Sequence, residues 1–397
     1  MTDGTRAGAA DLGESLHGAS QHGASQHVAQ RFGLLDALRG VAALVVLAYH
    51  LVQQHSLSAL PHAGLAVDFF YTLSGFVIAF AYDAQVRDGR LSRAGFARAR
   101  ARRLYPLLAL GTVMGFGVFL GAVFLRHSVS LRDAFLALGF ALALLPCPLF
   151  PQWPTAFPLN MAAWSLAFEA YVNLAYALIA RFLSQRVLLA LVGLGAVLVV
   201  TDIAHFGRLM GGTDKADFAF GAARVVYPFF AGILIFRWRR EPARRRPVLA
   251  IALCTGLAAA LLIVPERMIG LDPAIYDGAL ALIGFPLLVW LAAAVPLDGR
   301  VARAAHWLGL LSYPIYILQG PVLRLGVELG RHAPLPAAAL ALVQAVAVIA
   351  VAWAANRWFD APVQAWLRRA ERRRHTKTAP ADQGQAPFAR ALRSSRT

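Results

Sequence analysis

Ten apolar runs, each close to the length of a membrane span, dominate the middle of this chain. They lie near 33–53, 64–82, 104–125, 161–181, 187–203, 218–236, 247–264, 275–295, 305–329 and 336–357. A helix needs about 20 mostly apolar residues to cross the hydrocarbon core of a bilayer. Hydrophobic residues make up 58% and charged residues 15% of the chain, which excludes a soluble globular protein of this length. We therefore expect an all-α polytopic membrane protein with about ten transmembrane helices.

Arginine-rich loops orient these predicted spans. Seven arginines fall within 87–103 and six within 237–246, and loops of this kind stay in the cytoplasm. Two loops on the same side are joined by an even number of spans. Four long runs lie between them, so the shorter apolar run at 134–145 does not cross the membrane. We expect it to form a short re-entrant or interfacial helix on the extracytoplasmic side.

The same distribution of charge defines the ends of the chain. Residues 1–32 are predicted to be a disordered cytoplasmic tail, 33–366 the transmembrane domain, and 367–397 a basic cytoplasmic tail. The expected location is a bacterial cytoplasmic (inner) membrane, where the protein contacts membrane lipid. The net charge of +17 does not indicate a nucleic-acid partner, because the arginines gather in short loops between apolar runs. The two cysteines are too few for a disulfide framework or a cysteine-based metal site, and no metal is expected.

The first apolar run carries two residues that are costly in a membrane, Arg39 and His50. A charged side chain within a spanning helix must face protein or water, so it is a functional candidate. The two residues lie about 16 Å apart along a helix and about 20° from three whole turns, so they point from nearly the same face. With the predicted topology, Arg39 lies near the cytoplasmic side and His50 near the outer side.

Three further polar residues are predicted at the depth of His50. Asp68 begins the second run, Glu169 lies in the outer half of the fifth, and Gln319 lies past the middle of the ninth. Asp68 also fits the N-cap of its helix. A carboxylate within the membrane needs a partner, and the candidates for Glu169 are His50, whose ring it would orient, and Arg224.

Six motifs in a fixed order carry a family resemblance. They are Arg39-x10-His50; Asp68-Phe-Phe-Tyr-Thr-Leu-Ser74-Gly75-Phe76; Phe96, Arg100, Arg103 and Pro106; Trp164-Ser165-Leu166-x-x-Glu169; Arg224 with Phe230-Ala-Gly232; and Ser312-Tyr313-x-x-Tyr316. Together they resemble the membrane-bound acyltransferase-3 family of bacteria, whose members O-acylate cell-surface polysaccharides and other acceptors. Gln319 departs from the family, because many members have histidine there.

The resemblance implies an acyl-CoA donor, with acetyl-CoA the expected one, and an acceptor hydroxyl outside the membrane, with a glycan the expected one. Acyl transfer needs a base for the hydroxyl and stabilisation of an oxyanion. We expect His50 to be that base, or alternatively a transient acyl carrier, with Glu169 and Asp68 completing the catalytic group. Arg39, Arg100 and Arg103 are expected to bind the donor's phosphates and polar groups. Other candidate pocket residues are Ser74, Trp164, Arg224, Tyr316 and Gln319.

Two other functions fit ten spans with buried charges. The first is a proton-coupled transporter of a sugar or an organic acid, although such folds often show inverted repeats and the chain has no convincing repeat. The second is a scaffold subunit of a polysaccharide export machine, against which the charged residues at one depth argue. The sequence leaves the identity of the acceptor and the oligomeric state open.

Overall fold

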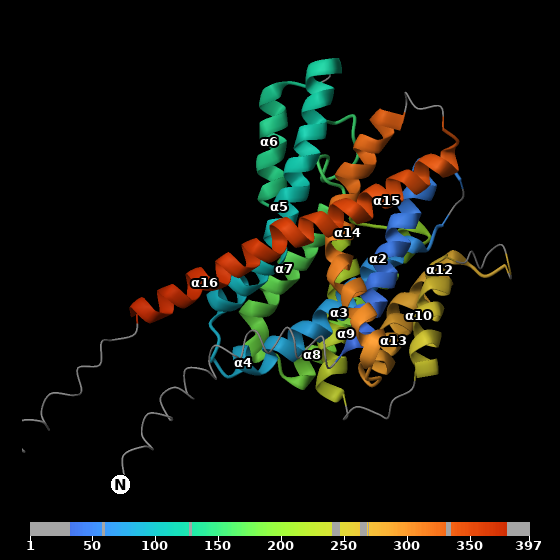
Figure 1. The fold of residues 1–397 in the computed structure, drawn as a ribbon. Coiled ribbons are helices and arrows are strands. Elements are labelled where there is room, and N and C mark those ends of the chain that lie inside the picture. Colours follow the sequence, from blue (N-terminus) through green and yellow to red (C-terminus); the bar gives the residue numbers. More distant parts are fainter. Residues whose placement is uncertain are drawn as a thin grey trace, which may run out of the picture.

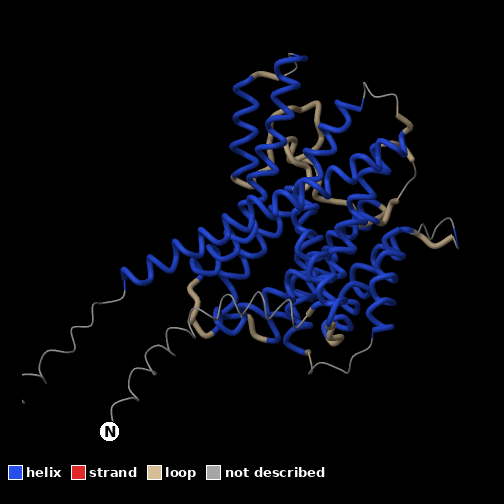
Figure 2. Tube along the Cα trace, in the orientation of Figure 1, coloured by secondary structure: helices blue, strands red, loops and turns tan. Residues whose placement is uncertain are grey.

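The computed structural model of the chain consists of helices joined by loops (Figures 1 and 2). It describes residues 32–57, 60–126, 129–239, 247–262, 268, 270–330 and 335–378. Within these residues the strand-like pairing is limited to one bridge between Thr155 and Asp214. The predicted all-α fold class is therefore confirmed.

Helices occupy all ten predicted transmembrane ranges, and eight helical segments in the described part of the chain are long and apolar enough to cross a bilayer. They comprise α2 (Gly33–Gln54), η1 (Ala63–Leu65) with α3 (Ala66–Ile78), η2 (Ala79–Asp83) and α4 (Ala84–Arg87), α5 (Arg93–Arg126), α7 (Ala163–Ile179) with η3 (Ala180–Phe182), α8 (Gln185–Phe206), η4 (Phe218–Phe220) with α9 (Gly221–Trp238), α12 (Pro273–Ala279) with η5 (Leu280–Gly284) and α13 (Phe285–Ala293), and α15 (Ala337–Ala355) with η6 (Asn356–Asp360) and α16 (Ala361–Thr378). The other two predicted ranges hold the shorter apolar helix α10 (Pro247–Leu262) and the long helix α14 (Gly299–Gly330). Polar residues in α14 lower its hydropathy.

The eleventh apolar run forms α6 (Leu131–Leu142), whose 12 residues are too few to span a bilayer. It packs beside the distal half of α5 in a lobe at the top of Figure 1. The carbonyl groups of Leu142 and Leu144, at and just after its end, accept hydrogen bonds from the hydroxyls of Tyr105 and Tyr171. These tyrosines satisfy carbonyls that a helix end leaves unpaired. The predicted short, non-spanning helix is therefore present.

Helices α2 and α14 pack along each other at the centre of the bundle and run parallel. The guanidinium of Arg39, near the start of α2, binds Ser312, near the middle of α14, and further along both helices Leu51 and Leu323 share one buried apolar cluster. This alignment fixes the two ends of α2 relative to α14. Arg39 lies at the level of Ser312, and His50 lies toward the C-terminal end of α2, beside Leu51, which shares a cluster with Leu323.

Helices α3 and α9 approach each other so closely that glycine is required on both. A Cβ at Gly75 would collide with the carbonyl oxygen of Phe229, and a Cβ at Gly232 would collide with that of Thr72. Small residues let membrane helices bring their backbones together. The glycines in two of the sequence motifs are therefore packing residues.

The chain remains helical beyond the predicted end of the membrane domain. α16 continues from η6 to Thr378, so the predicted basic tail is helical at its start. It leans on α5, where Gln364 donates a hydrogen bond to the carbonyl of Arg102 and Glu371 forms an ion pair with the Arg102 guanidinium. Phe32 is buried against the α3 and η2 aromatic rings, whereas the rest of the predicted N-terminal tail and residues 379–397 lie outside the described residues.

Candidate active site

A cavity of about 160 Å³ lies between α2, α3, α5, α7 and α14. Arginine, glutamate, serine and tyrosine side chains share its wall with apolar residues. The predicted site residues on this wall are Arg39, Ser74, Arg100, Arg103, Glu169 and Tyr316. The fold thus brings together residues that lie far apart along the chain. We call this space the arginine cavity.

Arg39 is held at the cavity by α14 and by its own helix. Its Nε donates to the Ser312 hydroxyl at 2.9 Å, and its Nη2 donates to the Gly309 carbonyl at 2.7 Å. Asp36, one turn earlier on α2, forms an ion pair with it at 3.0 Å. The side chain keeps 27% of its surface exposed. Arg39 is therefore oriented by protein contacts while part of it stays open to the cavity.

Glu169 has two partners in the structure, and neither is one that the sequence suggested. Arg100 donates to its Oε1 at 2.7 Å and Ser74 donates to the same oxygen at 2.8 Å. Within the described residues no hydrogen bond joins Glu169 to His50 or to Arg224. The expected pairing is therefore wrong: the carboxylate is a counter-ion for Arg100, because α5 and α7 place the two side chains on the same wall.

The arginine cavity carries more positive than negative charge. Arg39, Arg100 and Arg103 line it with a single carboxylate, that of Glu169. The Arg103 side chain forms no hydrogen bond or ion pair with any residue in the described ranges. The Nε of Arg100 is also buried without a partner there. Guanidinium groups with unused hydrogen-bond donors suit a polyanionic ligand, because each planar guanidinium can bind two phosphate oxygens at once.

Glu169 lies at the Arg39 end of α2 rather than at the His50 end. The reason is the segment before α7, which is sunk into the bundle: Asn160 is 1% exposed and donates to the carbonyl of Ile317, midway along α14. α7 thus begins level with the middle of α14 and carries Glu169 deeper. The expected shared depth of Glu169 and His50 is therefore wrong.

His50 is not part of the cavity wall. Its ring packs 5.0 Å from the ring of Tyr49, and it forms no hydrogen bond with the described residues. Phe70 lines the cavity, packs edge-on against Tyr316 with ring centroids 5.6 Å apart, and contacts the apolar cluster that contains Leu47. This aromatic pair is the part of the cavity wall that borders the cluster containing Leu47 and Leu51 of α2.

Hydroxyl groups form the end of the cavity nearest to this aromatic pair. Ser165 Oγ and the Tyr316 hydroxyl share a hydrogen bond of 2.7 Å, and the Tyr71 hydroxyl donates to the Ser165 carbonyl at 3.0 Å. All three residues are buried. A ligand that enters from the arginine end therefore meets hydroxyl groups at the other end of the cavity.

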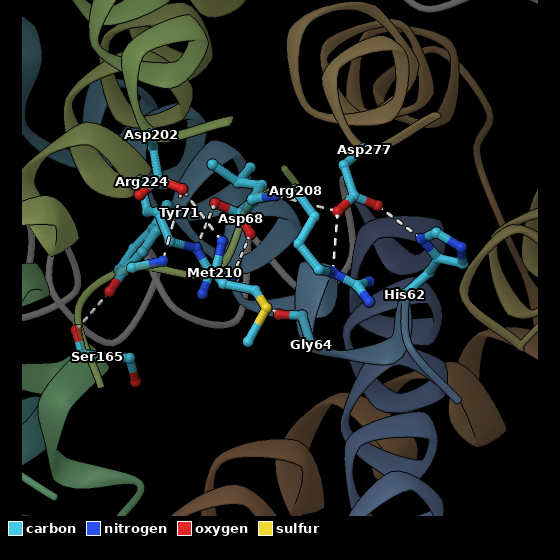
Figure 3. A network of polar contacts seen from close by, with 12 residues as sticks. His62, Gly64, Asp68, Tyr71, Ser165, Asp202, Arg208, Met210, Arg224 and Asp277 are labelled. Carbon is cyan, nitrogen blue, oxygen red and sulfur yellow. Dashed lines mark hydrogen bonds and ion pairs between the residues drawn. The ribbon is translucent and has the colours of Figure 1, made fainter. Parts of the chain in front are cut away.

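Asp68 and Arg224 form a buried ion pair outside the cavity (Figure 3). Arg224 Nη2 lies 2.5 Å and Nε 3.2 Å from the carboxylate oxygens, and a further bond reaches the Gly64 carbonyl. The Trp164 ring lies 5.2 Å from the guanidinium carbon, within reach of a cation–π contact. Asp68 caps no helix, so the N-cap interpretation is wrong. Asp68, predicted to be catalytic, and Trp164 and Arg224, predicted to line the pocket, therefore contact one another outside the cavity wall.

A second buried cluster adjoins this pair and was not anticipated from the sequence. His62 Nδ1 lies 2.6 Å from Asp277 Oδ1, and both side chains are fully buried. The other carboxylate oxygen accepts from the Leu209 backbone at 3.1 Å, with Arg208 at 3.6 Å. One signal was available: Asp277 is a carboxylate inside an apolar run and needs a partner. We call Asp68, Arg224, His62, Asp277 and Arg208 the sealed network.

Gln319 is buried in α14 and points away from water. Its Nε2 donates to the Tyr316 carbonyl at 3.0 Å, one turn earlier, while its Oε1 is buried without a partner in the described residues. It is absent from the cavity wall. Gln319 is thus a neutral side chain held by its own helix.

The amino-acid sequence matches a family described as an acyltransferase domain over residues 32–357. It is 33% identical over 186 residues to "Protein 2 in picA locus" of Rhizobium radiobacter, a match that covers 45% of this chain and 97% of that protein. It is 24% identical over 369 residues to the peptidoglycan O-acetyltransferase OatA of Listeria monocytogenes, which covers 83% of this chain and 55% of OatA. The chain therefore spans about half the length of OatA. No solved structure matches it.

Proposed function

The chain belongs to the acyltransferase-3 family, and we propose that it transfers an acyl group from a cytoplasmic acyl-CoA to a hydroxyl outside the membrane. The observation that carries this proposal is the arginine cavity. Arg39 from α2 and Arg100 and Arg103 from α5 converge there with one carboxylate among them. CoA is a polyanion, and guanidinium groups bind its phosphates in bidentate geometry.

The donor enters from the arginine-rich side with its acyl end leading. Arg100 and Arg103 lie at the end of the basic segment 87–103, so they meet the phosphates first, and Arg39 binds the pyrophosphate or the polar part of the pantetheine arm. The tyrosine and serine hydroxyls then line the path. Arg39 and His50 lie about 16 Å apart along α2, on the order of the length of an extended pantetheine arm. Movement of the Phe70–Tyr316 pair would open this path.

His50 is the general base in this mechanism. Its neutral imidazole takes the proton of the acceptor hydroxyl as the oxygen attacks the thioester carbonyl, and the resulting imidazolium gives a proton to the CoA sulfur as the carbon–sulfur bond breaks. Glu169 does not orient His50. It holds Arg100 through an ion pair and a shared bond to Ser74, so its proposed role is to position the phosphate-binding guanidinium.

Acetyl is the proposed acyl group and a cell-surface glycan the proposed acceptor. The name of the OatA relative, a peptidoglycan O-acetyltransferase, supports both. The proposed location is the bacterial cytoplasmic membrane, with both termini in the cytoplasm. The arginine-rich loops between spans support that orientation.

The experiment offers labelled acetyl-CoA to the purified full chain with a set of glycan acceptors. We expect label transfer by the wild type, and a loss of about 10²- to 10⁴-fold in His50→Ala, the contribution of a positioned base. His55→Ala, at the residue that directly follows α2, is the matched control and keeps its activity. Full transfer by a folded His50→Ala variant would contradict the role of His50. Vesicle uptake of a sugar without label transfer would favour the transporter alternative.

A further inference from the structure

A second cavity, of about 140 Å³, lies beside the arginine cavity between α5 and α7. The two share Arg100, Leu104 and Leu166 as walls. Tyr105 and Leu174 line the second cavity and are 44% and 56% exposed. Both lie on the outward faces of their helices, where a membrane protein meets lipid. We call this cavity the side slot; it opens toward the bilayer.

One polar side chain in the side slot, Asn173, has no hydrogen-bond partner among the residues that the structure describes. Asn173 is 3% exposed, and neither its Nδ2 nor its Oδ1 forms a hydrogen bond with the described residues. A buried amide left unpaired is destabilising, and native structures rarely retain one without a ligand or water. The occupant of the slot is therefore expected to supply an acceptor, a donor or both at this point.

The side slot has a polar end and an apolar end. Asn173 follows Glu169 by one turn of α7, and Glu169 is paired with Arg100, so the slot's polar groups lie toward the arginine-rich loop. Leu108 and Leu144 line the opposite end. From Ala97 to Leu108 the helix rises about 16 Å. Polar groups at the interface and an aliphatic channel leading inward match the order of groups in a phospholipid.

We propose that the side slot binds one anionic phospholipid of the leaflet next to the arginine-rich loop. The hydroxyls of its headgroup meet Asn173, its phosphate lies near Arg100, and one acyl chain runs along α5 toward Leu108. Basic residues next to a membrane attract anionic lipids, and Arg100 of the arginine-rich segment 87–103 lines this end of the slot. A zwitterionic lipid of the same chain length lacks the net charge. This inference does not depend on the proposed reaction.

The test compares phosphatidylglycerol with phosphatidylcholine on the full chain in detergent, by thermal unfolding and by native mass spectrometry. Phosphatidylglycerol should raise the unfolding midpoint of the wild type more than phosphatidylcholine does. Asn173→Leu removes the amide, and Ala101→Phe fills the mouth of the slot. Both variants should lose this difference, with about fivefold weaker phosphatidylglycerol binding in Asn173→Leu. Ala350→Phe, at an exposed alanine on α15, should retain it.

Stability without lipid separates a ligand-binding role of Asn173 from a structural one. In lipid-free detergent, Asn173→Leu should unfold at a higher temperature than the wild type, because it removes an unpaired buried amide. A lower midpoint would show that Asn173 supports the fold and would overturn its proposed role. An equal response of the wild type to both lipids, or an intact phosphatidylglycerol response in both slot variants, would overturn the lipid site.

Discussion

The arginine cavity and the sealed network both place arginine and carboxylate side chains inside the membrane domain, but they differ in how far these side chains are buried and paired. In the sealed network Arg224 and Asp68 are 4% and 1% exposed. Two nitrogens of the Arg224 guanidinium donate hydrogen bonds to the Asp68 carboxylate. In the arginine cavity Arg39 remains 27% exposed and Arg103 has no ion pair within the described residues. The sealed network pairs its positive charges with negative ones, whereas the arginine cavity keeps an excess of positive charge.

This difference separates charges that hold the fold from charges that are available to a ligand. Breaking a buried ion pair in a membrane protein strongly destabilises the fold, because removal of one partner leaves an uncompensated charge. An arginine without a protein partner contributes little to the fold and is free to bind an anion. Substitutions in the two regions should therefore affect different quantities: folding in the sealed network and donor binding in the arginine cavity.

The largest effect is expected for Arg224→Met in the sealed network. The substitution leaves Asp68 buried without a cation, which costs about 3–5 kcal/mol. We expect most of the protein to aggregate or unfold during purification, as measured by size-exclusion chromatography and thermal unfolding. The double variant Asp68→Asn with Arg224→Met removes both charges and should recover part of the loss. A single variant that is as stable as the wild type would show that this pair does not hold the fold.

A smaller and selective effect is expected for Arg39→Ala in the arginine cavity. Loss of a charge-assisted hydrogen bond to a phosphate should raise the KM for acyl-CoA about tenfold. The KM for the acceptor should stay unchanged, because the acceptor approaches from the His50 end. Steady-state kinetics with each substrate varied in turn measure both quantities. An equal rise in the two KM values would place Arg39 at a general structural position.

The smallest effect is expected at Asp214, in the loop that continues from Arg208 toward η4. Burial, with a smaller contribution from Asp217, raises the pKa of the Asp214 carboxyl above its ordinary value. A raised pKa means that this carboxyl favours the fold when protonated and that this contribution is lost as the pH rises through the folded-state value. Asp214→Asn should therefore stabilise the protein at neutral pH, by about 0.5 kcal/mol or less. Thermal unfolding near pH 3 should show no gain, and an equal gain at both pH values would exclude the charge as its cause.

The helices were predictable from the sequence because run length and loop charge are local properties. Ten apolar runs and an even number of spans between two arginine-rich loops predicted the ten helices and the short α6. The depth in the membrane domain at which α7 begins was not predictable from the sequence. It depends on Asn160, which binds the backbone of α14 at Ile317, and hydropathy contains no information about such a contact.

The candidate site was predictable in its residue types but not in its pairings. The motifs led to Arg39, Arg100, Arg103 and Glu169, which share one wall. The motifs did not show that Arg100 forms an ion pair with Glu169, or Arg224 with Asp68. Such pairing depends on how the helices face each other in three dimensions. Asn173 and the His62–Asp277 pair lie outside the motifs and were found from the structure.

The most direct test of the account is the affinity of the purified full chain for acetyl-CoA in wild type and Arg103→Gln. Arg103 lines the arginine cavity and forms no hydrogen bond or ion pair with the described residues. Arg98→Gln, at an exposed arginine on the same helix, is the matched control. We predict about tenfold weaker binding for Arg103→Gln, with unchanged thermal stability and an unaffected control. Equal affinity in all three proteins would contradict the assignment of this cavity to the phosphate end of the donor.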